Sequence, residues 1–373
     1  MKAAVVLVLL LTLPMGAQSL ELGRRSFEAG DLAAAERAFA EAVRQQPEAP
    51  EPLYWLGVVH LRQGRNAQAE AALEQAVALR PGYFEAWNAL GVMYDRQGRF
   101  DKSGPAFEQA LRAQPDHVNT HYNLGLSYLR QRRFEEALAK FGRVLELSPR
   151  HKGAYLQAGM ARYELEQWAE AGAALEKFLE LEPKDGFGHL KLGETLFQLA
   201  RFQEAITSFQ KAAALGPDSS RAWTQLGVTH YNLGQYREAV TALESALKAN
   251  PANFEALLQL GVIRAEEGDA AGALAHLDKA LALRPEDPDA RYQVARVRLF
   301  ENKAEEALKI LEAVADRFPE HAKAHYQLAL TYQRLNQPEK ARAAMRTFQQ
   351  LEAAARARKK GAERRAYAGA AAR

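Results

Sequence analysis

Residues 220 to 253 read SRAWTQLGVTHYNLGQYREAVTALESALKANPAN, and this stretch decides the fold. Trp223, Leu226 and His230 recur at spacings of three and four, which is the pattern of one face of a helix. A glycine then breaks the chain, and a second helical series with alanines and a leucine facing inward ends before Pro251. The stretch therefore predicts two antiparallel helices joined by a tight turn.

This pattern repeats along nearly the whole chain with a period of 34 residues. Prolines follow the period at Pro47, Pro81, Pro115, Pro149, Pro183, Pro217, Pro251, Pro285 and Pro319. Glycines do so at Gly23, Gly57, Gly91, Gly125, Gly159, Gly193, Gly227 and Gly261, with Ala295 and Ala329 in the last two units. A third, small-residue series comprises Ala35, Ala69, Ser103, Ala137, Ala171, Ala205, Ala239, Ala273, Ala307 and Ala341.

Ten such units fit residues 16 to 355. They start near residues 16, 50, 84, 118, 152, 186, 220, 254, 288 and 322. One hairpin of this length cannot bury its apolar face alone, so neighbouring hairpins must stack and share a core. The predicted fold class is all-α, an α-solenoid of antiparallel helical hairpins.

The units resemble the tetratricopeptide repeat family. In residues 84 to 117 the family pattern is matched by Trp87, Leu90, Gly91, Tyr94, Gly98, Phe107, Ala110 and Pro115. The resemblance covers residues 20 to 355, and it implies a right-handed superhelix whose first helices line a concave groove that binds other polypeptides. It also implies a scaffold without an enzyme activity.

The two ends depart from the repeat. Lys2, an apolar run from Ala3 to Leu11 and small residues near Ser19 are typical of a cleaved signal peptide over residues 1–19, so the first helix is expected to start about at Leu20. The apolar run is too short to span a membrane. At the other end Ala353 replaces the proline, so the last helix is expected to continue into the Ala- and Arg-rich tail, residues 356–373.

The charges of the chain are concentrated in that tail. The net charge is +3, yet seven Lys and Arg residues face one Glu in residues 356–373, so the repeats themselves are mildly acidic. This distribution argues against nucleic acid as a partner. The tail is read as a capping helix, with peripheral contact to anionic lipid as the alternative.

No motif for catalysis, a cofactor or a metal is found. The chain has no cysteine, and its glycines recur once per hairpin rather than in a phosphate-binding loop. His117 with His121 and His321 with His325 have a spacing that could suit a metal, but one member of each pair falls in a turn, so packing is the preferred explanation. We also expect Pro105 to kink its helix unless it lies in the first turn.

Polar residues occupy the sixth position of the first helix in seven successive units. An amide can pair with the backbone of an extended peptide, so we interpret this amide ladder as a peptide-binding surface, similar to the asparagine ladder of the O-linked N-acetylglucosamine transferase family. The alternative is that the amides bond neighbouring hairpins together. The ladder consists of Asn123, Gln157, Lys191, Gln225, Gln259, Gln293 and Gln327.

Aromatic, apolar and basic residues flank the ladder. Aromatics favour binding surfaces, although each could equally be an ordinary core residue. Three arginines in phase could hold a carboxylate, or could simply be a solvated edge. The aromatics are Tyr54, Tyr122, Tyr292 and Tyr326 at the fifth position and Phe27, Tyr163, Phe197 and Tyr231 at the twelfth; the arginines are Arg62, Arg96 and Arg130. An apolar strip at the ninth position contains Val58, Val92, Leu126, Met160, Val228, Val262 and Leu330.

These features predict a non-enzymatic scaffold of the bacterial cell envelope, periplasmic or secreted, that binds proteins or peptides. Two alternatives stay open: a carbohydrate-associated binding module for polysaccharide export or cell-wall synthesis, and a non-catalytic subunit of a separate enzyme.

Overall fold

A computed structural model describes residues 15–216 and 219–371, with side chains as far as Arg358. Most of the predicted signal peptide, residues 1–14, therefore lies outside the described residues. The same is true of Pro217 in the proline series and of the end of the basic tail. All regular secondary structure in the described ranges is α-helical.

The helices alternate regularly between a first helix and a second helix of each repeat. Up to Pro183 they are α2 (Met15–Glu28), α3 (Leu32–Gln45), α4 (Pro50–Arg62), α5 (Asn66–Leu79), α6 (Phe84–Arg96), α7 (Phe100–Ala113), α8 (Val118–Arg130), α9 (Phe134–Leu147), α10 (Lys152–Glu164) and α11 (Trp168–Leu181). From Lys184 they are α12 (Gly186–Gln198), α13 (Phe202–Leu215), α14 (Ser219–Asn232), α15 (Tyr236–Ala249), α16 (Phe254–Glu266), α17 (Ala270–Leu283), α18 (Pro288–Phe300), α19 (Ala304–Arg317), α20 (Ala322–Arg334) and α21 (Pro338–Ala371).

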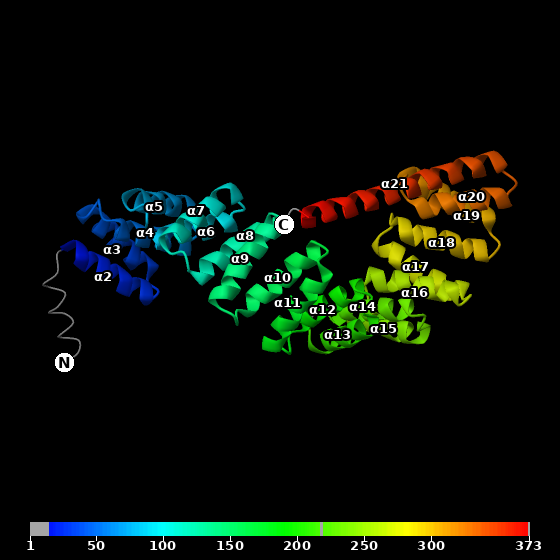
Figure 1. The fold of residues 1–373 in the computed structure, drawn as a ribbon, viewed down its shortest axis with the longest axis horizontal. Helices are drawn as coiled ribbons and strands as arrows, with labels where there is room; N and C mark the ends of the chain where they lie inside the picture. Colours follow the sequence, from blue (N-terminus) through cyan, green and yellow to red (C-terminus); the bar gives the residue numbers. More distant parts are fainter. Residues whose placement is uncertain (1–14, 217–218, 372–373) are drawn as a thin grey trace. The chain divides into compact units, whose positions relative to one another are not determined.

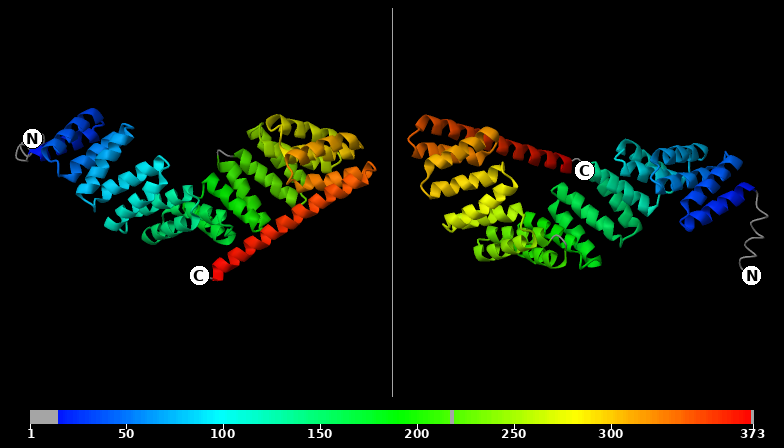
Figure 2. Two further views of the ribbon diagram at one scale, coloured as in Figure 1. Left: turned by 90° about the horizontal axis from the view of Figure 1, so that it is seen from above. Right: turned by 180° about the vertical axis from the view of Figure 1, so that it is seen from behind.

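The chain divides into two compact units, Met1–Pro183 and Lys184–Arg373. Within each unit the two helices of a hairpin pack against each other, and each hairpin packs against the next (Figures 1 and 2). First helices also contact first helices of the next repeat, as α4 contacts α6 and α14 contacts α16. Each unit is therefore a stack of helical hairpins in which one side is formed by consecutive first helices.

The periodic glycines and alanines set the close approach of the two helices. A Cβ atom at Gly91 would lie 2.6 Å from Cδ1 of Phe107, which has an exposed fraction of only 1%. Ala137 in α9 and Ala239 in α15, from the third series, are fully buried. Small residues at the crossing let the large residues beside them fill the core without voids.

The turn inside each hairpin needs one residue in the left-handed region. Gly98 has a φ of 70° after α6, where glycine meets no steric penalty. Arg132, at the equivalent place after α8, has a φ of 58°. The turn geometry is thus kept by the stacking of the helices even where glycine is replaced.

The first helix starts earlier than the sequence suggested. Helix α2 begins at Met15 rather than near Leu20. Gly16 is buried against the side chain of Gln46, and Ser19 Oγ donates a hydrogen bond of 3.2 Å to Gln45 Oε1. These contacts with Gln45, the last residue of α3, and with Gln46 extend α2 into residues that were predicted to belong to the signal peptide.

Helix α7 runs unbroken through Pro105, which lies beyond its first turn. Helix α7 is therefore not interrupted at the proline, and the expected kink stays a prediction. Helix α21 is much longer than the other second helices and continues to Ala371. No helix in the described part of the chain combines the length and apolar character that crossing a bilayer requires.

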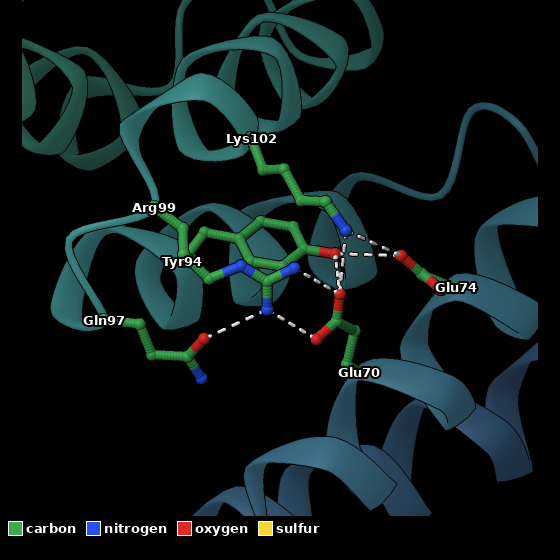
Figure 3. A network of polar contacts seen from close by, with 6 residues as sticks. All are labelled: Glu70, Glu74, Tyr94, Gln97, Arg99 and Lys102. Atoms are coloured by element: carbon green, nitrogen blue, oxygen red, sulfur yellow. Dashed lines mark hydrogen bonds and ion pairs between the residues drawn. The ribbon is translucent and has the colours of Figure 1, made fainter.

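A polar network joins α5 to the following hairpin (Figure 3). Two nitrogens of the Arg99 guanidinium donate to the two Glu70 oxygens at 2.6 and 2.8 Å, and Lys102 Nζ donates to Glu70 Oε1 at 3.0 Å. Tyr94 Oη lies 2.9 Å from a Glu74 oxygen and 3.1 Å from a Glu70 oxygen, so the two carboxylates share its single hydroxyl proton. Bidentate pairing with arginine adds geometric specificity, so this network fixes how the two hairpins stack.

Candidate peptide-binding surface

The candidate surface is the side of each unit that consecutive first helices form. All members of the amide ladder lie on first helices and are half-buried. In the unit up to Pro183 they are Asn123 on α8 and Gln157 on α10. In the unit from Lys184 they are Lys191, Gln225, Gln259, Gln293 and Gln327 on α12, α14, α16, α18 and α20.

The hydrogen bonds of the ladder side chains stay within their own helices. Gln259 Nε2 donates to Glu255 at 3.0 Å, and Gln293 Oε1 accepts from Arg296 at 2.9 Å. Among the hydrogen bonds of the described residues, none links a ladder amide to a neighbouring hairpin. The alternative explanation, in which the amides hold the repeats together, therefore lacks the contacts that it requires.

The fifth-position tyrosines have a different role, because three of their rings contact a ring that lies directly before the first helix of the next repeat. Tyr122 lies 4.8 Å from the ring of His151, and Tyr292 lies 5.6 Å from that of His321. Tyr54 contacts Tyr83 in the same way, at 5.3 Å. Burial raises the pKa of Tyr54, Tyr122 and Tyr292. These tyrosines are partly packing residues that leave an edge at the surface.

Tyr326 is the most open of the fifth-position tyrosines. Its exposed fraction is 41%, and its ring lies 5.1 Å from Phe348 of α21. It therefore offers more ring surface to a partner than Tyr54, Tyr122 or Tyr292, which are half-buried.

Three of the four twelfth-position aromatics pack across the turn of their own hairpin, whereas Phe27 packs on Trp55 of the next repeat with centroids 5.6 Å apart. Three pairs share an edge-to-face geometry with centroids 4.8 to 5.8 Å apart: Tyr163 with Trp168, Phe197 with Phe202, and Tyr231 with Tyr236. Tyr231 Oη also donates to Glu266 of the next first helix at 2.7 Å, and burial followed by this carboxylate raises its pKa to about 12. The main role of these rings is therefore to stabilise the turn of the hairpin, and contact with a partner is a secondary role.

The three arginines have different surroundings in the structure. Arg62 places its guanidinium 5.4 Å from the centroid of the Phe27 ring, and Arg130 forms an ion pair with Asp95. Arg96 is exposed. Arg130 is therefore bound to a carboxylate of the protein itself. This carboxylate is largely buried, since the side-chain exposure of Asp95 is only 10%. The arginine row thus acts between repeats at Arg62 and Arg130.

The histidine pairs have packing roles in the described structure. His117 and His321 cap α8 and α20, where each Nδ1 accepts the backbone N–H three residues later. His121 and His325 each bind the carbonyl oxygen of a proline six residues earlier. No group of three or more potential metal ligands occurs among the residues that the structure describes.

A charged cluster on α12 and α14 was not identified from the sequence. Glu194 occupies the ninth position, where most units carry an apolar residue, and its exposed fraction is 8%. Its two oxygens accept from Lys191 at 2.8 Å and Arg221 at 2.6 Å. In the sequence, the only sign of this cluster was that Glu194 breaks the apolar strip at the ninth position. The cluster neutralises Lys191, which interrupts the ladder of amides.

The stacked hairpins define a class of protein, the α-solenoids built from two-helix repeats, which present extended surfaces to partners. The family follows from profile matches: tetratricopeptide repeat profiles match residues 124–186, 187–252 and 224–288. This chain is a tetratricopeptide-repeat protein, and proteins of this class are interaction scaffolds. Two further profiles match, the C-terminal domain of cilia and flagella-associated protein 70 over residues 5–150 and subunit 3 of the anaphase-promoting complex, or cyclosome, over 266–348.

Solved structures with similar architecture include several repeat proteins. YrrB, described as a TPR protein with an unusual peptide-binding site, is 27% identical, with a TM-score of 0.43 over 50% of this chain and 95% of its own. Yeast Tom70 is 14% identical, with a TM-score of 0.48 over 90% and 92%. Cut9 with Hcn1 is 14% identical, with a TM-score of 0.49 over 91% and 94%. A comparison with curated proteins gives no match.

Proposed function

We propose that this protein is a non-enzymatic scaffold of the bacterial cell envelope that binds extended peptide segments along its first helices. The observation that carries the proposal is the amide ladder. Its amides are half-buried on the side of the first helices, and none is bound to a neighbouring hairpin among the described hydrogen bonds. A primary amide both donates and accepts, so it matches the peptide group of a bound chain.

This mode of recognition is tolerant of sequence. Amides that bind backbone N–H and C=O groups fix the path of a peptide without reading its side chains. Side-chain preference would come from the apolar strip at the ninth position and from Tyr326. The charged cluster of Lys191, Glu194 and Arg221 interrupts both series, so we infer that it divides the apolar part of the surface.

The proposed location rests on the N-terminal sequence. Lys2 followed by a short apolar run and small residues near Ser19 favours export. Mass spectrometry of protein recovered from the periplasm of an expressing bacterium tests this directly. A mature N-terminus at Leu20 supports export with cleavage, whereas retention of Met1 in the cytoplasm contradicts it.

The binding proposal is tested with the full chain and an array of overlapping 12-residue synthetic peptides. The test variant carries Gln225, Gln259, Gln293 and Gln327 changed to Ala. The matched control carries the same change at exposed glutamines of second helices: Gln203, Gln210, Gln349 and Gln350. We expect the ladder variant to lose most peptide binding and the control to retain it, at equal helicity by circular dichroism.

Backbone recognition predicts a second result. Peptides that bind the wild type should bind poorly when alternate backbone nitrogens are methylated, because methylation removes the N–H donors. If the ladder variant binds the array as the control does, the amides are not the binding surface. Saccharide binding in the absence of peptide binding would favour the carbohydrate alternative, which the packed rings of Tyr54, Tyr122 and Tyr292 do not support.

A further inference from the structure

An apolar pocket is lined by residues of three helices of the unit from Lys184, namely α17, α18 and α19. These three helices follow one another in Figure 1. Its volume is about 350 Å³, within the range of small-molecule sites. It is separate from the amide ladder. The residues that line it are Leu281, Arg291, Val294, Lys309, Ile310 and Ala313.

The pocket lies in a repeat that lacks the ring carried by six of the ten repeats at position 4. This position is Arg291 here and Ser19, Leu53 and Leu257 in the other repeats without a ring; the rings are Trp87, His121, Tyr155, His189, Trp223 and His325. Trp87 packs against the core cluster that includes Val77, Leu90 and Ala106. These three residues are equivalent in the repeat to Leu281, Val294 and Ile310, which are walls of the pocket. The pocket thus corresponds to the space that an aromatic ring fills in another repeat.

Arg291 makes the same contact as the donor end of those rings, but it has no ring to fill the space beside it. Its Nε donates to the carbonyl oxygen of Pro285 at 2.8 Å. Its terminal nitrogen donates to Glu286 at 2.7 Å, and Arg317 binds the other oxygen of Glu286 at 2.5 Å. Two arginines therefore share one carboxylate, and these three side chains together carry one net positive charge.

Lys309 adds a second cation at the pocket. It is exposed, and no ion pair of Lys309 is found among the described residues. An apolar, ring-sized space next to the ammonium of Lys309, unpaired among the described residues, is complementary to a flat apolar group that carries an anion.

We propose that this pocket binds a small aromatic carboxylate. The ring takes the place that the indole of Trp87 occupies in its own repeat, between Leu281, Val294 and Ile310. The carboxylate lies at the mouth and pairs with Lys309. The proposal does not depend on peptide binding by the amide ladder.

Indole-3-propionate is a suitable probe, because its ring is that of the missing tryptophan. Its binding to the full chain is measured by ligand-observed saturation-transfer NMR, with its alcohol analogue as the uncharged control. We expect a Kd of about 1 mM or tighter for the acid, as is usual for a ligand of this size. We expect weaker binding of the alcohol.

Arg291→Trp is the decisive variant. Tryptophan is already present at this repeat position in Trp87 and Trp223, and its Nε1 can bind the Pro285 carbonyl as Trp87 binds Pro81. The variant should fill the pocket, keep or raise thermal stability and abolish binding of the probe. Lys309→Gln should weaken binding about threefold, the usual size of an exposed charge pair, while Lys279→Gln on α17 should not change it.

Three results would overturn the proposal. The first is no binding of the acid to the wild type, and the second is equal binding to Arg291→Trp at unchanged helicity. The third is equal affinity for the acid and its alcohol together with no effect of Lys309→Gln, which would remove the anionic part of the recognition.

Discussion

Tyr155 Oη donates a hydrogen bond of 3.1 Å to the carbonyl oxygen of Pro149, six residues earlier in the chain. The same contact is made by Trp87 to Pro81, His121 to Pro115 and His325 to Pro319. Arg291 donates to Pro285 in the same way, whereas Leu53 and Leu257 hold position 4 of their repeats without a donor. Where position 4 carries a planar side chain with a donor at its end, the donor ties the first helix to the turn before it.

Tyr155→Phe removes only the donor of this contact. We expect the free energy of unfolding to fall by about 1 kcal/mol, the usual net contribution of one hydrogen bond. Urea denaturation followed by circular dichroism measures the change. Tyr236→Phe is the matched control, because Tyr236 is 43% exposed and forms no described hydrogen bond through its hydroxyl. Equal changes in the two variants would show that the Pro149 contact contributes nothing.

Gly91→Ala should destabilise the protein by about 1–3 kcal/mol, the cost of overpacking a core. The added Cβ would lie 2.6 Å from the ring of Phe107, which is buried on all sides. At the positions equivalent to Gly91 and Phe107, the ninth repeat has Ala295 and Leu311, and both are buried in one cluster. Phe107→Leu should therefore recover part of the loss caused by Gly91→Ala.

A double-mutant cycle over Gly91 and Phe107 measures this coupling. Thermal unfolding of the wild type, both single variants and the double variant supplies the four values. Additive effects, with no recovery in the double variant, would mean that the glycine is required for a reason other than the Phe107 ring.

Glu70 should make the stability of the protein depend on pH in the acid range. The Arg99 hydrogen bonds, with help from Lys102 and Tyr94, lower its pKa from 4.5 to about 2. The lowered pKa means that the carboxylate stabilises the native state fully above pH 4.5, and that this contribution is lost as the pH falls towards 2. After allowance for partial exposure, the loss should be about 1–2 kcal/mol.

The Glu70→Gln variant tests this assignment. At pH 7 it should be less stable than the wild type, and the difference should shrink when denaturation is repeated near pH 3. Glu244→Gln is the control, because Glu244 is exposed and has no described ion pair. A difference for Glu70→Gln that is the same at both pH values would contradict the role of its ionised form.

The start of α2 predicts an effect of N-terminal processing. A chain that begins at Leu20 lacks the contact of Gly16 with Gln46 and the hydrogen bond of Ser19 to Gln45. We expect faster amide hydrogen exchange in α2 and α3 than in a chain that begins at Met15, with a loss of about 1 kcal/mol in that hairpin. Ser19→Ala in the longer chain isolates the hydrogen bond. Identical exchange in the long and short chains would show that the first turn of α2 does not stabilise the hairpin.

Much of the fold could be predicted because its signals are local and repeated. Gly91 and Ala137 lie at fixed places in a 34-residue period, and a helix pair is determined by such spacings without knowledge of distant contacts. The start of α2 could not be predicted in the same way. It depends on Gln45 and Gln46 at the end of α3, which hold Gly16 and Ser19 through contacts across the hairpin.

The candidate surface was predicted only in part. The sequence placed the amides of Gln225 and Gln259 on one face of their helices, because helical periodicity fixes a face. It could not show that Tyr122 packs on His151 or that Arg130 pairs with Asp95, because the first contact reaches the N-cap residue of α10 and the second joins α6 to α8.

The sequence by itself determined the helical hairpins, their 34-residue period and the small residues at each crossing, because these follow from the spacing of residue types along one chain. Only the tertiary structure decided which side chains are bound and which remain available. Glu194 is bound by Lys191 and Arg221, while the space beside Arg291 stays open, because Arg291 binds Pro285 and Glu286 with its polar end and has no ring. Those outcomes depend on distances between helices, which the order of residues does not contain.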